Sequence, residues 1–198
     1  MISRRAALGQ LGALVLASCD KAEPRPDHSW IGEINWRDDF RRFEAPGLQV
    51  VRSWDFAATL HGFVAEGGEL SHQPGVGAKL VSRSGDPKLR SPNGIDLPGD
   101  AANLVLVRMV RVLAAGPWDG ALYYATARRG ESAAYMALPV ATWPPETASP
   151  ITLVYDMANP ARGGDDWTRS QISQLRLDTE AAPGGVALIA QIALAQRG

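Results

Sequence analysis

Apolar and polar residues alternate along most of the chain from residue 48 onward, which is the pattern of β-strands with one buried face. The segment 103–112, NLVLVRMVRV, is apolar on both faces, as a central strand would be. Glycine and proline separate these segments at intervals near the roughly 8 to 12 residues expected of a β-sandwich. The predicted strands cover residues 48–56, 68–72, 78–82, 87–91, 103–112, 121–127, 134–140, 151–157, 171–178 and 185–194.

Strands and helices do not alternate along the chain, so a parallel α/β sheet is not indicated. The 20 glycines and 14 prolines suit a fold with many turns. The sequence therefore predicts an all-β protein, an antiparallel β-sandwich of jelly-roll type.

A helical spacing occurs once, in INWRDDFRRFEAPG. Trp36, Phe40 and Phe43 stand at i, i+4 and i+7, and Pro46-Gly47 ends the pattern. We expect a short amphipathic helix over residues 36–43. This helix either packs on the flank of its own domain or binds a partner protein.

The N-terminus has the features of an export signal. Arg4 and Arg5 precede a short apolar run, Ala6 to Ala17, which has fewer residues than the roughly 20 that span a bilayer. Ser3-Arg4-Arg5 resembles a twin-arginine motif, and Leu16-Ala17-Ser18-Cys19 resembles the lipobox of bacterial lipoproteins. We predict a lipoprotein signal peptide over 1–18, a lipidated tether over 19–34 and a β-sandwich domain over 35–198.

Cys19 is the only cysteine of the chain. Its lipidation would leave the mature protein with no thiol and no disulfide, although its compartment is oxidising. The expected location is the periplasm or the cell surface, with a membrane anchor at Cys19. The formal net charge of −1 and the absence of a basic patch with interleaved aromatic residues argue against a nucleic acid partner.

A series of motifs follows in order along the predicted domain. They are WDF at 54–56, SGDPKLRSPNGIDL at 84–97, LVLVRMVRV at 104–112, WDGALYYAT at 118–126, LVYDM at 153–157 and DDWTRSQISQLRLDTE at 165–180. The series resembles the carbohydrate-binding-module-like β-sandwich domains of galactose-binding-like jelly-roll type. The resemblance covers roughly residues 50–196, and it implies a jelly-roll fold and a glycan or polysaccharide ligand.

The alternation within QISQLRLD places Leu175 and Leu177 toward the core and Arg176 and Asp178 on the outer face of their sheet. If the strands carrying Arg108 and Asp156 lie beside it, these four residues form one polar cluster. Guanidinium and carboxylate groups could then hold vicinal sugar hydroxyls. An aromatic residue would stack on the sugar ring, and the candidates for this role are Trp118 and Tyr124, with Tyr123 as the neighbouring choice.

The predicted ligand-binding residues are Arg108, Trp118, Tyr124, Asp156 and Arg176. The alternative interpretation of the charged residues is a set of cross-strand ion pairs without a ligand. The alternation thus places these charged residues on one face of a sheet, where they have either a ligand-binding or a structural role.

Metal chemistry has little support in the sequence. GGDDW at 163–167 could be a calcium loop or an ordinary turn, and it lacks the alternating acids of an EF-hand. In the related jelly-rolls the last strand often carries an acid that helps to hold calcium, and here Ala190 stands near that place. No metal or cofactor is predicted.

Catalysis is not predicted either, because the three histidines are scattered and no G-x-S-x-G motif is present. The leading function is a cell-envelope lipoprotein with a non-catalytic glycan-binding domain. The alternative is a scaffold that docks another envelope protein through the sheet face or the 36–43 segment. A glycoside hydrolase or lyase ranks third, and it would require two opposed carboxylates in a deep groove.

Overall fold

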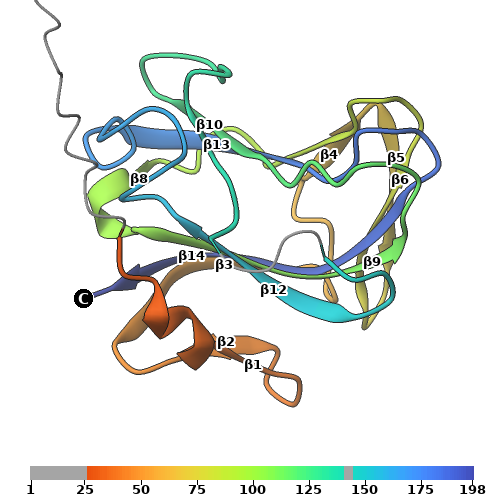
Figure 1. The fold of residues 1–198 in the computed structure, drawn as a ribbon, viewed down its shortest axis with the longest axis horizontal. Helices are drawn as coiled ribbons and strands as arrows, with labels where there is room; N and C mark the ends of the chain where they lie inside the picture. Colours follow the sequence, from red (N-terminus) through yellow and green to blue (C-terminus); the bar gives the residue numbers. More distant parts are fainter. Residues whose placement is uncertain (1–25, 141–144) are drawn as a thin grey trace, which may run out of the picture.

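The computed structural model describes residues 26–140 and 145–198, which form a sandwich of two six-stranded antiparallel sheets (Figure 1). The first, called here the β13 sheet, comprises β11 (Met136–Ala137), β10 (Leu122–Thr126), β13 (Gln171–Asp178), β7 (Lys88–Arg90) and β4 (Val64–Glu66) in that order, with β8 (Leu97–Pro98) also paired to β13. The second, the β9 sheet, comprises β12 (Pro150–Asp156), β9 (Leu104–Leu113), β14 (Val186–Arg197), β6 (Gly77–Ser82) and β5 (Gly68–Gln73), with β3 (Leu48–Asp55) paired to β14.

The predicted antiparallel sandwich is confirmed, and each of the ten predicted segments contains a strand. From β9 onward the chain crosses repeatedly between the two sheets, as expected of a jelly-roll. The sequence pattern missed β4 and β8, which have three and two residues.

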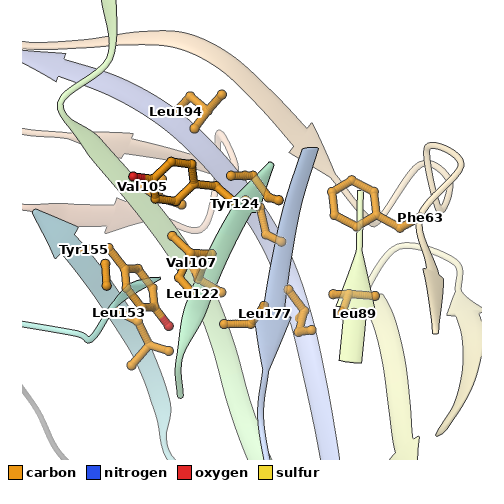
Figure 2. Packing of buried hydrophobic residues seen from close by; sticks show 14 of the residues in the cluster. Phe63, Leu89, Val105, Val107, Leu122, Tyr124, Leu153, Tyr155, Leu177 and Leu194 are labelled. Carbon is orange, nitrogen blue, oxygen red and sulfur yellow. The ribbon is translucent and has the colours of Figure 1, made fainter. Parts of the chain in front are cut away.

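The core lies between the sheets and is filled by the inward residues of facing strands (Figure 2). Val105 and Val107 of β9 face Leu122 and Tyr124 of β10, and all four are buried. Complete burial of one aliphatic side chain contributes roughly 1.5–3 kcal/mol. The inward residues that the alternation marks therefore supply the main stabilisation of the fold.

Residues 36–43 form a hairpin, so the predicted helix is wrong. The strands β1 (Asn35–Arg37) and β2 (Arg42–Glu44) pair antiparallel, with Trp36 directly opposite Phe43. The seven-residue spacing that suggested a helical stripe also brings two aromatic residues together across a hairpin. The five-residue 3-10 helix η1 (Ser29–Glu33) comes just before it.

The hairpin and η1 cover part of the outer surface of the β9 sheet (Figure 1). Phe43 is 4% exposed and packs in a second apolar cluster with Leu106 of β9 and Val154 of β12, against which Trp30 and Ile31 of η1 also pack. The later part of the predicted tether therefore lies on the sandwich.

The predicted signal peptide, Cys19 and the start of the tether lie outside the described residues. Within residues 26–140 and 145–198, no helix has the length and apolar character needed to cross a bilayer.

Candidate ligand-binding face

The outer surface of the β13 sheet carries a continuous row of side chains across four strands. Cross-strand register aligns Tyr123 of β10 with Arg176 of β13, Arg90 of β7 and Val64 of β4. The adjacent row, Leu122, Leu177, Leu89 and Ala65, faces the core. Since successive residues of a strand point to opposite faces, burial of the leucine row sets the outward direction of the other row.

Arg176 is at the centre of an ion network on this face. Its Nε donates to Asp178 Oδ1 at 2.7 Å, and its Nη2 donates to Asp86 Oδ1 at 3.1 Å. Its Nη1 lies 3.6 Å from Glu131 Oε1. These contacts hold the guanidinium in one orientation, and half-burial removes part of the competition from water.

The same network extends to β7 and β4. Arg90 is paired with both Glu66 and Glu131, and Lys88 Nζ lies 2.9 Å from Asp86 Oδ2 and 3.3 Å from Glu66 Oε1. Each cation of the network has at least one carboxylate partner. The face is therefore rich in fixed hydrogen-bonding groups but has no unbalanced cation for a strongly acidic ligand.

Tyr123 stands at one end of the row, beside the guanidinium of Arg176, whose Cζ lies 4.6 Å from the ring centroid. Burial raises the pKa of the Tyr123 phenol, and nearby Asp119 adds to this effect. The phenol therefore stays neutral at physiological pH. It offers one hydroxyl and the apolar edge of a ring whose position is restricted by Arg176.

Asp178 lies beneath this layer and is 2% exposed. Burial raises its pKa to about 6, although the hydrogen bonds from Arg176 act in the opposite direction. The carboxyl group thus supports Arg176 from below and is not accessible from the surface.

An open depression of about 560 Å³ adjoins the row on the side of Arg90 and Glu131. Its polar lining includes Asn93, Ser173 and Gln174, and the Gln174 amide also donates to the Ser91 carbonyl at 2.8 Å. The turn that follows β10 rises at this edge of the sheet (Figure 1). The depression lies in the range of typical ligand pockets, roughly 300–1,000 Å³, and its amides and hydroxyls can both donate and accept hydrogen bonds.

No family model and no curated protein matches the chain. Among solved structures, the chain is similar to the CBM22-1 xylan-binding domain of Paenibacillus barcinonensis Xyn10C, with 12% identity, a TM-score of 0.47 and coverage of 76% of this chain and 96% of that one. A variant of a family 29 carbohydrate-binding module, complexed with cellulohexaose, has 10% identity, a TM-score of 0.45 and coverage of 75% and 89%. A carbohydrate esterase of the Shiga toxin-encoding bacteriophage phi24B has 13% identity, a TM-score of 0.42 and coverage of 77% and 100%.

Of the five residues predicted to bind ligand, only Arg176 lies on this face. Tyr124 is completely buried in the core (Figure 2) and donates its hydroxyl to Asp166 at 3.0 Å, while Tyr123 takes the outward position. Trp118 is 6% exposed, and the guanidinium of Arg111 lies 5.5 Å from its ring centroid. Stacking of a sugar on Trp118 or Tyr124 is therefore excluded by burial in this structure.

The predicted cluster of Arg108, Asp156, Arg176 and Asp178 does not form, because β9 and β12 pair with each other in the opposite sheet. Asp156 is buried there and accepts hydrogen bonds from the Asn159 amide at 2.9 Å and from two backbone amides, and it also bonds the His28 ring at 3.0 Å. Asp156 therefore holds the loop at residues 158–159 and the N-terminal segment around His28 against the end of β12.

Sequence reasoning missed Lys88, Arg90, Glu131 and Gln174. The alternation Lys-Leu-Arg at 88–90 was a usable signal, because a buried Leu89 requires both basic residues to face outward. Glu131 lies in the connection between β10 and β11, 41 residues from Arg90, and no local pattern connects them.

In the GGDDW segment both carboxylates are engaged by arginines: Asp165 pairs with Arg169 at 2.9 Å, and Asp166 pairs with Arg129 and accepts from Tyr124. Across the described ranges, no group of three or more His, Cys, Asp and Glu side chains is placed to hold a metal ion. Turn formation accounts for this segment.

Proposed function

We propose that the outer face of the β13 sheet binds a neutral glycan chain without cleaving it. The observation that carries the proposal is the row of Tyr123, Arg176 and Arg90, held by an ion network beside an open polar depression. Three neighbouring strands, β10, β13 and β7, present these groups side by side, so the face has the extent needed to contact more than one sugar unit.

The chemistry of the face suits sugar hydroxyls. Carboxylates of Glu66 and Glu131 can accept hydrogen bonds, and N–H groups of Arg90 and Arg176 can donate them. Because these side chains already hold one another, binding would immobilise few additional rotamers, which lowers its entropic cost. The edge of Tyr123 supplies an apolar contact for the C–H groups of a sugar ring.

Hydrolysis is not part of the proposal. A glycoside hydrolase requires a protonated acid and a second carboxyl group facing the same bond. Asp178 has the raised pKa that such an acid needs, but it is buried beneath Arg176. The hydrogen bonds and charges of Lys88 and Arg90 hold the pKa of Glu66 below its usual value, so it is not the protonated acid. Glu131 is paired with Arg90 and lies 3.6 Å from Arg176.

For the cellular location, the supporting observation is the N-terminal sequence, in which paired arginines, a short apolar run and a lone Cys19 follow one another. We propose an envelope lipoprotein anchored through Cys19. Labelling of producing cells with a fatty-acid analogue should modify the native chain and not the Cys19→Ser variant. Equal labelling of both chains would reject the anchor.

The glycan proposal is tested with the full chain carrying Cys19→Ser, so that lipid does not interfere. Affinity electrophoresis and calorimetry against neutral polysaccharides such as xylan and mixed-linkage glucan should show saturable binding. Tyr123→Ala and Arg90→Ala should weaken it, while Lys79→Ala, an exposed change in the opposite sheet, should not. If a folded protein binds none of the polysaccharides, the proposal fails and docking to an envelope protein becomes the leading function.

A further inference from the structure

A second concave surface lies on the opposite side of the sandwich, where the β1–β2 hairpin crosses the outer face of the β9 sheet (Figure 1). Two neighbouring depressions, of about 570 and 200 Å³, share Trp36, Arg108 and Pro150 in their linings. We call this surface the hairpin groove. None of the residues of the outer face of the β13 sheet, called here the Tyr123 face, contributes to it.

The hairpin is firmly attached to the sheet, so the groove is a fixed feature. Arg41 donates to both carboxylate oxygens of Asp55 at 2.9–3.0 Å, and it also donates to the carbonyl of Val76 at 3.1 Å. Gln191 of β14 donates to the Arg41 carbonyl at 2.9 Å. Trp36 packs edge-on against the buried Phe43, with ring centroids 5.0 Å apart.

Two guanidinium groups approach the ring of Trp36, and they differ in their partners. The Cζ atoms of Arg41 and Arg108 lie 5.9 and 5.8 Å from the ring centroid. Arg41 is occupied by Asp55 and carbonyl groups. Among the residues that the structure describes, no side chain or carbonyl accepts a hydrogen bond from Arg108, and no carboxylate lies within 4.0 Å of it.

Arg108 is nevertheless partly removed from water. Burial lowers its pKa, and the charge of Asp38 opposes that effect without forming an ion pair. A half-buried guanidinium with free donors gains from an anionic acceptor, because the charge-assisted bonds replace lost hydration. The groove therefore has a cation available to a ligand, whereas the cations of the Tyr123 face are already paired.

The remaining lining defines the kind of anion. Asp38 also accepts a hydrogen bond from Trp36 Nε1 at 2.6 Å, and its nearby charge disfavours a dianion such as a phosphate monoester. Trp36 and Pro150 offer apolar surface, while Asn35 and Thr152 offer an amide and a hydroxyl. A single carboxylate on a hydroxylated ring matches this combination of charge, apolar surface and polar groups.

We propose that the hairpin groove binds a carboxylated sugar, a uronic acid unit, with its carboxylate on Arg108 and its ring against Trp36. The larger depression has the volume of a typical small-ligand pocket. This site is independent of glycan binding at the Tyr123 face, and either can exist without the other.

The test uses the full chain with Cys19→Ser and calorimetry against trisaccharides of glucuronic, galacturonic and mannuronic acid. At least one should bind saturably, and its methyl ester, which keeps the ring but removes the charge, should bind at least roughly 10-fold more weakly. Arg108→Gln should cause a loss of similar size, and Arg108→Lys a smaller one, because lysine keeps the charge but not the two-pronged geometry. Trp36→Leu should weaken the trisaccharide and leave binding of acetate unchanged.

Arg169→Gln is the matched control, since it makes the same change at an exposed arginine outside both surfaces and should leave uronide binding intact. Circular dichroism confirms that each variant is folded. The proposal is overturned if no uronide binds, if the methyl ester binds equally well, if Arg108→Gln binds as tightly as the native residue, or if acetate binds as tightly as the trisaccharides.

Discussion

The guanidinium of Arg176 lies over the ring of Tyr123, with 4.6 Å between its Cζ and the ring centroid, and these two residues are direct cross-strand partners on β13 and β10. The contact joins the aromatic end of the candidate face to its ion network. It follows that changes at either residue should alter both the binding of a glycan and the order of the other side chain.

Two replacements of Tyr123 distinguish the contribution of its hydroxyl from that of its ring. Tyr123→Phe keeps the ring and the contact with Arg176, so it should lower the affinity for a neutral polysaccharide only about twofold to fivefold. Tyr123→Ala removes the ring and should lower it by roughly tenfold or more. Calorimetric titration measures both, and equal affinities for native protein and Tyr123→Ala would place the ligand elsewhere.

Loss of Arg176 should destabilise the domain through Asp178. Arg176→Met leaves a carboxyl group that is 2% exposed without its two-pronged partner, at a cost of about 3 kcal/mol at neutral pH. Urea unfolding gives the free energy. The double variant Arg176→Met/Asp178→Asn should recover part of the loss, whereas additive losses would show that the two residues are energetically uncoupled.

Asp178 should make stability depend on pH in the mildly acidic range. Because burial raises its folded pKa to about 6 from the ordinary value of 3.8, the folded state binds this proton more tightly than the unfolded state. The resulting stabilisation is complete below pH 3.8 and is lost as the pH rises through 6.

Relative to the non-titrating Asp178→Asn variant, the native protein should therefore lose on the order of 2 kcal/mol between pH 4 and pH 7. Denaturant unfolding of both proteins at several pH values isolates this group, since the other titrating groups cancel in the difference. A difference that stays constant, or that grows in favour of the native protein with pH, would contradict the assignment.

Phe43 should hold the hairpin on the β9 sheet. Phe43→Ala removes a side chain that is 4% exposed and packs on Leu106 and Val154, and we expect a loss of about 3 kcal/mol. Hydrogen exchange should accelerate in residues 35–44 more than in β13. Uniform acceleration throughout the domain would show that the hairpin unfolds only together with the sandwich.

The strands and the inward or outward direction of their residues could be predicted because these are local properties. Leu175 and Leu177 point into the core and Arg176 points out, as the alternation indicated, since a period of two requires no knowledge of neighbours. The prediction failed where one residue spacing is compatible with both a helix and a β-hairpin. Trp36 and Phe43 are seven residues apart on a helix but face each other in the hairpin.

The composition of each face depends on which strands are neighbours. Arg108 and Arg176 look alike in sequence, yet β9 pairs with β12 and β14 while β13 pairs with β10 and β7, so the two arginines lie on opposite sides of the molecule. Hydrogen bonding between strands and burial of two apolar faces against each other bring together residues far apart in the chain. For that reason the alternation of the chain was enough to locate ten of the strands and the residues that point into the core. The Arg90–Glu131 contact, and the absence of a carboxylate partner for Arg108 among the described residues, came from the packing of the sheets.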